Sequence, residues 1–203
     1  MKRRTFTPDQ IKYLRDRAEE QYENMRGSRA YRNVEFFIYI LIVVLTALSI
    51  RSFLAEPIRV DGDSMIPTLI NNEDMLVEKV GYWFSDPSRG DMVICYYPGY
   101  TESCVKRVIG LPGETVSITG GLIYINGVAL DESDYWNGEI VGDMDPITVG
   151  AREVFVVGDN RNGSKDSRNP AVGCIPYAKV VGRVIAVVWP FDVFRTFERV
   201  SDS

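Results

Sequence analysis

The chain has 203 residues, enough for one domain of ordinary size with an additional segment. It contains no histidine and only three cysteines, which excludes a Ser-His-Asp or Cys-His catalytic set, an imidazole metal site and a four-ligand structural zinc site. The net charge of -5 argues against nucleic-acid binding as the main role. Its 45% of hydrophobic residues predict a folded chain.

The first 33 residues differ in charge from the rest of the chain. They hold nine Lys/Arg and five Asp/Glu, or +4, whereas residues 34–203 hold fourteen and twenty-three, or -9. Thr7-Pro8-Asp9-Gln10 has the composition of a helix start with a capping box. The apolar residues that follow share one helix face, so we expect a short helix against a membrane or a partner, with no chemistry of its own: Ile11, Leu14, Ala18, Tyr22 and Met25.

An apolar segment follows, with fifteen uncharged positions from Phe36 to Ile50. As a helix, the 21 residues 34–54 would span roughly 31 Å, close to the thickness of a bilayer core, if Arg51 extends toward the headgroups. A buried helix of a soluble domain and a cleavable signal peptide are the alternatives. The long segment before it and the charge of Arg51 argue against cleavage, so we expect an uncleaved transmembrane anchor.

The charge difference also predicts the orientation of this anchor. Positive charge collects on the cytoplasmic side of a membrane segment. We therefore expect residues 1–33 in the cytoplasm, a single pass through the plasma membrane at residues 34–54, and residues 55–203 outside, with the lipid bilayer as one partner.

Residues 55–203 have the pattern of a β domain. Short β-branched and aromatic runs alternate with turn signals such as Pro98-Gly99 and Asn126-Gly127, and no long helix is evident. An antiparallel sandwich or barrel is expected, with residues 113–152 as an acidic surface excursion. The predicted strands are Ile58–Asp61, Met75–Val80, Asp91–Tyr97, Cys104–Ile109, Thr115–Thr119, Leu122–Ile125, Glu153–Val157 and Lys179–Trp189.

Without histidine, a serine can still be activated by a neutral lysine, which must be buried so that its pKa falls. Lys106 lies in a strand where alternation places it on one face with Cys104 and Val108. Taken alone, this segment favours an edge lysine facing water over a buried one.

Ser64 follows a strand that ends near Gly62, and Pro67 restricts the turn three residues later. Such a turn can expose both a nucleophilic hydroxyl and a backbone N–H for an oxyanion, although an ordinary turn serine has the same pattern. A third segment, Gly158 to Asn169, is dense in turn formers and charges. It predicts a hydrogen-bonded polar loop of unspecified role.

Taken together, these segments closely resemble bacterial type I signal peptidase, the membrane-bound serine endopeptidase that removes signal peptides from secreted preproteins. The resemblance runs from the anchor to about Pro190, and the single anchor is similar to the Gram-positive form. It rests on Ser-Met-Ile-Pro-Thr-Leu (64–69), Arg-Gly-Asp-Met-Val (89–93), Lys-Arg-Val-Ile-Gly-Leu-Pro-Gly-Glu (106–114) and Gly-Asp-Asn-Arg-x-x-Ser-x-Asp-Ser-Arg (158–168).

The resemblance implies a mainly β fold of coiled antiparallel sheets and a Ser/Lys dyad that needs no metal or cofactor. Ser64 matches the nucleophile, Lys106 the general base, and Ser164 the serine that orients the lysine amine. The charged residues that match supporting positions are Asp159, Arg107, Asp166 and Arg168.

Four positions depart from the best-known Gram-negative pattern. Gly62 stands where those enzymes have a serine that helps to bind the oxyanion, so a second oxyanion donor beside the Ser64 N–H is left open. Glu114 replaces an aspartate, and Asn162-Gly163 replaces Asp-Asn. None of these changes removes a residue of the dyad.

The expected substrate is an extended signal peptide, added as a strand with small side chains in shallow pockets. Val60, Met65, Leu69 and Val105 flank the dyad in sequence and are the expected pocket walls. A secretion translocon is an expected partner and nucleic acid is not. Two alternatives are an inactive membrane-tethered β domain that only binds peptides and a Ser/Lys self-cleaving repressor, which would need a DNA-binding segment instead of an anchor.

The cysteines allow one disulfide. A hairpin with a loop at Pro98–Thr101 would set Cys95 opposite Cys104, and an external compartment permits oxidation. We nevertheless favour two reduced, partly buried thiols over this bond. Cys174 would then be a small buried hydrophobic residue.

Overall fold

The computed structural model describes residues 7–49 and 55–199. The chain divides into two compact units, Met1–Ile50 and Arg51–Ser203. The first unit is helical, and the second contains all of the described strands.

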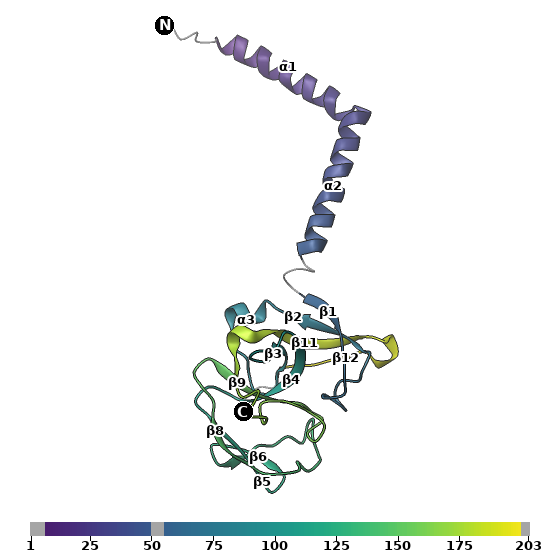
Figure 1. The fold of residues 1–203 in the computed structure, drawn as a ribbon. Coiled ribbons are helices and arrows are strands. Elements are labelled where there is room, and N and C mark those ends of the chain that lie inside the picture. The colour runs from purple at the N-terminus through teal and green to yellow at the C-terminus, as the bar shows by residue number, and fades with distance from the viewer. Residues whose placement is uncertain (1–6, 50–54, 200–203) are drawn as a thin grey trace. The chain divides into compact units, whose positions relative to one another are not determined.

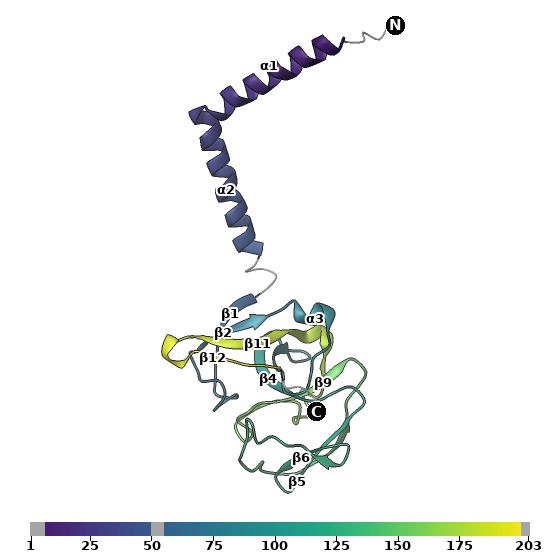
Figure 2. The same ribbon diagram turned by 180° about the vertical axis from the view of Figure 1, so that it is seen from behind.

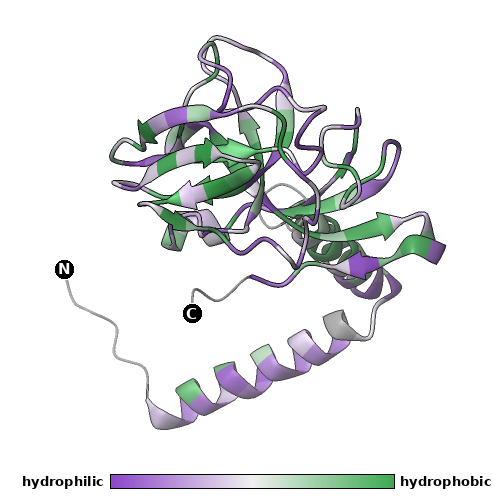
Figure 3. Ribbon diagram, turned by 90° about the horizontal axis from the view of Figure 1, so that it is seen from below, coloured by the Kyte–Doolittle hydropathy of each residue, from purple (hydrophilic) through white to green (hydrophobic). Residues whose placement is uncertain are grey.

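Helix α1 of the first unit spans Pro8–Arg26 (Figure 1). Its start has the predicted capping box, because the Thr7 N–H donates to Gln10 Oε1 at 3.0 Å and the Gln10 N–H donates to Thr7 Oγ1 at 3.4 Å. Ile11 and Leu14 are exposed, and polar residues dominate the rest of the helix (Figure 3). The side chain of Met25 lies outside the described part.

Helix α2 spans Arg29–Ser49 and therefore begins five residues before the predicted anchor. Ser28 explains this start, since its Oγ accepts a hydrogen bond from the Tyr31 N–H at 3.1 Å. The helix is long and apolar enough to cross a membrane, and none of its residues is buried, which disfavours the core helix of a soluble domain. Residues 50–54, including Arg51, lie outside the described residues.

The second unit contains two antiparallel sheets, which confirms the expected fold class (Figures 1 and 2). The larger has the order β1-β2-β11-β3-β4-β9-β10, with β12 paired to β11, and the smaller has the order β7-β6-β5-β8. The strands are β1 Ala55–Arg59, β2 Asp74–Glu78, β3 Met92–Tyr96, β4 Ser103–Gly110, β5 Thr115–Thr119, β6 Leu122–Ile125, β7 Val128–Ala129, β8 Met144–Thr148, β9 Glu153–Val157, β10 Ile175–Pro176, β11 Val180–Trp189 and β12 Arg195–Thr196. A short helix, α3, spans Gly81–Phe84.

Irregular pairing bends the larger sheet. Strand β11 shifts register against β2 between Val184 and Ala186 and again between Val187 and Trp189. An extra residue on one strand increases the local twist and turns the strand away from a flat course. The result is a curled sheet whose central strand β4 lies between β3 and β9.

Three hydrophobic clusters hold the domain together. The first joins the β1–β2 region to β11, and the second covers one face of β3, β4 and β9. The third joins Ile109 and Phe155 of the larger sheet to Val116 and Ile118 of the smaller one. Gly110 lies at this junction, where a β-carbon would collide with side chains of Val116 and Phe155, so the close approach requires glycine.

Residues 113–152 are more than the surface excursion that their composition predicts. They form the whole smaller sheet, and Ile140, Val149 and Glu132 are buried. All eight predicted strands overlap observed ones. The unpredicted strands are β7, β8, β10 and β12, of which three have only two residues, and long-range pairing rather than local pattern defines them.

Candidate active site

Ser64 lies in the loop that connects β1 to β2. Both ends of this loop are closed by backbone hydrogen bonds, from the Val60 N–H to Glu73 O at 2.8 Å and from the Asn72 N–H to Val60 O at 3.0 Å. The neighbouring Met65 and the more distant Leu69 are buried in the first cluster. These anchors hold the loop in place while Ser64 itself stays partly exposed.

Lys106 lies in the middle of β4 and is only 3% exposed. Its Nζ donates to Ser64 Oγ at 2.7 Å and to the carbonyl oxygen of Val105 at 2.8 Å. Burial lowers the pKa of Lys106, because the ammonium form loses its hydration. The structure therefore joins the two residues that the sequence singled out, and it rules out an edge lysine facing water.

The polar loop after β9 fits against the Ser64 loop. The Asn160 N–H donates to Ser64 O at 3.0 Å, and Asn160 Nδ2 donates to Asp63 O at 3.0 Å. Gly158 leaves no room for a β-carbon, which would collide with Ser164 Oγ and Ser64 O. Two polypeptide segments almost a hundred residues apart are thus held in contact at Ser64.

The predicted supporting residues form two ion pairs, one buried and one partly buried. Arg107 donates to both carboxylate oxygens of Asp159, at 2.8 and 2.6 Å, and Thr68 Oγ1 donates to the same carboxylate at 2.6 Å. Asp166 pairs with Arg168 through two bonds of 2.7 Å and accepts the Gly158 N–H at 3.0 Å. These pairs fix the loop on both sides of Ser164.

Ser164 does not make the bond that the resemblance implies. Its Oγ is buried and has no hydrogen-bond partner among the described residues, and Lys106 donates to Val105 O instead. The hydroxyl lies against Gly158, close to the backbone of Ser64.

The positions that depart from the Gram-negative pattern have partners of their own. The exposed Gly62 has a φ of 96°, and its N–H donates to Asn71 Oδ1 at 3.1 Å. Glu114 accepts two bonds from Arg89, at 3.0 and 2.6 Å. Asn162 accepts the Val141 N–H at 2.9 Å. Glu114 and Asn162 therefore serve the fold, and neither contacts the dyad.

The expected pocket walls are mostly buried in this structure. Val60, Met65 and Leu69 are at most 4% exposed and belong to the first cluster, and the half-buried Val105 packs against it. Leu69, with no exposed surface, can only support a pocket from beneath. Val105 is the one of the four with substantial surface for a substrate.

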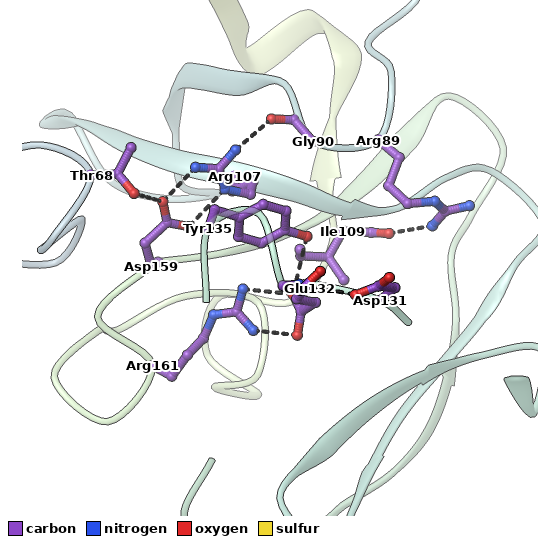
Figure 4. A network of polar contacts seen from close by, with 12 residues as sticks. Thr68, Arg89, Gly90, Arg107, Ile109, Asp131, Glu132, Tyr135, Asp159 and Arg161 are labelled. Carbon is purple, nitrogen blue, oxygen red and sulfur yellow. Dashed lines mark hydrogen bonds and ion pairs between the residues drawn. The ribbon is translucent and has the colours of Figure 1, made fainter. Parts of the chain in front are cut away.

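A polar network beside the site was not found from the sequence (Figure 4). The ring of Tyr135 lies under the guanidinium of Arg107, whose Cζ is 4.0 Å from the ring centroid. Next to it, Arg161 makes a bidentate ion pair with Glu132 at 2.8 and 2.7 Å, and both residues are buried. Glu132 and Tyr135 belong to the acidic stretch read as surface, and nothing in their local pattern distinguishes them from solvated residues.

Among the described residues, no group of three or more Cys, Asp or Glu side chains is placed to hold a metal ion.

Comparisons with known proteins identify the family of this chain. The family described as signal peptidase, peptidase S26, matches residues 33–189. Signal peptidase I of Leptolyngbya laminosa is 41% identical over 157 residues, which cover 73% of this chain and 76% of that protein. Signal peptidase I of Bacillus licheniformis is 37% identical over 186 residues, which cover 87% of this chain and 97% of that protein.

A solved structure of a signal peptidase I from Enterococcus faecalis V583 has 35% sequence identity and a TM-score of 0.43, and the alignment covers 49% of this chain and 97% of that one. The relatives do not favour a non-catalytic peptide-binding domain or a self-cleaving repressor. On the family match and on these identities, the chain belongs to the signal peptidase family, peptidase S26.

Proposed function

We propose that Ser64 and Lys106 are the nucleophile and the general base with which this protein cleaves signal peptides from preproteins. As a signal peptidase I, the chain is a serine endopeptidase. The single observation that supports the two roles is the 2.7 Å contact between Lys106 Nζ and Ser64 Oγ, made by a lysine that is 3% exposed.

The proposed reaction proceeds in two steps. Neutral Lys106 accepts the Ser64 hydroxyl proton, and Oγ attacks the carbonyl carbon at the cleavage site. Lys106 then gives that proton to the departing amine, which leaves the signal peptide as an ester on Ser64. In the second step Lys106 takes a proton from water, the hydroxide attacks the ester, and the proton returns to Ser64 Oγ.

The oxyanion formed in each step needs a fixed donor. We assign this role to the Ser64 N–H, because the flanking carbonyls of Asp63 and Ser64 are both held by Asn160. These bonds restrict the backbone around the nucleophile before substrate arrives. The Gly62 N–H is bonded to Asn71 and would have to be released to serve as a second donor.

The substrate is proposed to bind as an extended strand with small side chains near the cleaved bond. Val105 offers a partly exposed surface beside the base, and Val60, Met65 and Leu69 form the layer beneath the loop. A well-filled layer leaves only shallow depressions, which fits small side chains rather than large ones.

Helix α2 is proposed as a single-pass anchor in the plasma membrane, with the N-terminal segment cytoplasmic and the β domain outside. The lipid bilayer and a secretion translocon are the proposed partners at this location. Protease added to cells without a wall should digest the β domain and protect the segment before α2. Digestion of that segment alone would contradict the orientation.

The cleavage proposal is tested with the full chain in detergent and a peptide that has Ala-x-Ala before the scissile bond. Mass spectrometry should find one cut after the second alanine, and the Ser64→Ala variant should leave the peptide intact. Ser85→Ala is the matched control, since Ser85 is an exposed serine at the end of α3. Equal cleavage by Ser64→Ala would overturn the assignment of the nucleophile.

A further inference from the structure

Two cysteines face each other next to the proposed base. Strands β3 and β4 pair with Cys95 opposite Cys104, the register predicted from the sequence for this hairpin. Their Sγ atoms are 3.7 Å apart, and both thiols are free in this structure. Directly opposed positions of an antiparallel pair have Cβ atoms about 4.5–5.5 Å apart, so a small adjustment of the strands and side chains allows a bond of about 2.05 Å.

The two thiols differ in access and in acidity. Cys95 is fully buried, whereas Cys104 is partly exposed. The hydrogen bond from Cys95, together with the positive charge of Lys106, lowers the pKa of Cys104 to about 7, although burial opposes the shift. The hydrogen bond to Cys104 and burial raise the pKa of Cys95 well above its usual value. This is the asymmetry of an attacking thiolate and a resolving thiol.

Cys104 and Lys106 lie two residues apart on the same face of β4. A thiolate on either cysteine raises the pKa of Lys106 and so opposes the effect of burial. The carboxylates that face Lys106 are Asp166 and Asp159, and each is already paired with an arginine. Tyr97, which also faces Cys104, donates its hydroxyl to Lys165 O at 2.5 Å.

We propose that Cys95 and Cys104 are a reversible disulfide site, and that closing it extends the activity of the enzyme to lower pH. The second part rests on the proposed role of Lys106 as the base. The first part depends only on the cysteine pair.

The oxidant is a disulfide of low molecular weight. The Cys104 thiolate attacks one of its sulfurs, which forms a mixed disulfide and releases one thiolate. Cys95 then gives up its proton and attacks Cys104 Sγ, which releases the second thiolate. The two cysteines lose two electrons and two protons, and the external disulfide is reduced to two thiols.

The sign of the effect on activity follows from the charges. In the reduced enzyme, a thiolate on Cys104 lies two residues from Lys106 on the same face of β4, and Lys106 must then lose its proton against that negative charge. The disulfide carries no charge, so the pKa of Lys106 falls when it forms. A larger fraction of the base is then neutral at the same pH, and the acid limb of the activity profile moves to lower pH.

The first experiment detects the bond itself. The full chain in detergent is incubated with oxidised or reduced glutathione, alkylated in denaturant and analysed by mass spectrometry. After oxidation, Cys174 alone should be alkylated and one peptide pair should contain Cys95 linked to Cys104. Reduction should return three alkylated cysteines. Three alkylated cysteines, or stable glutathione adducts, after oxidation would overturn the site.

The second experiment measures kcat/KM against pH for both redox forms. Around the acid limb, the oxidised enzyme should be roughly three- to tenfold more active than the reduced one, since one unit of pKa is a tenfold change. Cys104→Ser should match the oxidised profile in the presence of either form of glutathione. Cys174→Ser should respond to glutathione as the wild type does.

The two proposals fail in different ways. If the Cys95–Cys104 disulfide forms but the pH profiles of the oxidised and reduced enzymes coincide, the proposed effect on Lys106 is wrong. The disulfide site itself would still be supported. If Lys106→Arg remains active, the proposed base is wrong, whereas the alkylation pattern does not depend on catalysis. The Ser64→Ala variant should form the bond as readily as the wild type.

Discussion

Two consecutive basic residues of β4 differ in what surrounds them. Lys106 and Arg107 are both buried, at 3% and 6% exposure, and point to opposite faces of the strand. Arg107 meets the carboxylate of Asp159 in a bidentate pair with the ring of Tyr135 beneath it (Figure 4). Lys106 meets the hydroxyl of Ser64 and a carbonyl oxygen, and none of the ion pairs among the described residues includes it.

This difference suits the proposed base and a structural cation to adjacent positions of one strand. Burial removes the hydration of both side chains. Opposite Arg107 a buried carboxylate restores the lost stabilisation, so the guanidinium keeps its charge. On the other face only neutral oxygens contact the amine, and the pKa of Lys106 is lowered by burial. We therefore expect the lack of an ion-pair partner among the described residues to leave Lys106 able to act as the proposed base.

The largest expected effect comes from removing the lone pair of Lys106. Lys106→Arg and Lys106→Met should each lower kcat/KM by about 10²–10⁴-fold, the contribution typical of a general base. A guanidinium stays protonated and a thioether cannot accept the proton. Peptide cleavage measures the loss, and Lys179→Arg and Lys179→Met, at an exposed lysine, are the controls. Turnover by Lys106→Arg near the wild-type value would contradict the dyad.

For stability, we expect the larger effect at Arg107 and the smaller one at Lys106. Arg107→Met leaves the fully buried Asp159 without its cation and should lower the free energy of unfolding by about 3–5 kcal/mol. Lys106→Met breaks no ion pair and should change it by about 1 kcal/mol or less.

Urea unfolding of the full chain in detergent, followed by tryptophan fluorescence, gives both values. Arg59→Met removes an exposed pair with Asp74 and should lower stability by about 1 kcal/mol or less. A loss for Lys106→Met equal to that for Arg107→Met would show that Lys106 also serves the fold.

The pH profile sharpens the comparison further. Because burial lowers the pKa of Lys106, the enzyme should work below the ordinary pKa of lysine, and its activity should be lost as the pH falls and the amine is protonated. At pH values below the pKa of Lys106, kcat/KM should fall about tenfold for each pH unit. Circular dichroism at each pH shows that the domain stays folded. If activity instead fell as the pH was raised through the same range, the expected direction of the pH dependence would be wrong.

The smallest of the predicted effects on activity is expected for substitution of Ser164. Its buried Oγ has no partner among the described residues, so Ser164→Ala should leave stability unchanged or slightly raised. If the hydroxyl bonds the amine once substrate is bound, kcat should fall by about tenfold or less, the value of one hydrogen bond.

Ser167→Ala is the matched control for that change. Its Oγ accepts the Val156 N–H at 3.0 Å, so its removal should lower stability by about 1–3 kcal/mol and leave kcat nearly unchanged. A drop in stability for Ser164→Ala with no change in kcat would assign Ser164 to the fold alone.

Much of the fold was predictable from local pattern. The eight predicted strands rest on β-branched runs between turn residues, and the capping box of α1 rests on the spacing of Thr7 and Gln10. The start of α2 was misplaced because hydropathy marks the apolar part of a helix. Its actual start is set by the cap at Ser28.

The site was predictable in its residues and less so in its contacts. Lys106 and Ser64 came from the chemistry available without histidine and from a family resemblance. That Glu132 and Tyr135 lie against Arg161 and Arg107 depends on how the smaller sheet folds back, which no short segment encodes. Acidic residues in turn-rich stretches are usually solvated, so their burial here could not be anticipated.

The sequence by itself determined the class of fold and the position of the apolar helix, and it supplied the pair of side chains proposed for acyl transfer, because these depend on composition, periodicity and residue chemistry. Only the tertiary structure decided which buried cation has a counter-ion, that the Ser164 hydroxyl has no partner within residues 7–49 and 55–199, and that the Sγ atoms of Cys95 and Cys104 lie 3.7 Å apart. Each of these depends on distances between atoms from separate strands and loops. Because the acidity of a buried group depends steeply on such distances, the reactivity of the site is a property of the packed domain.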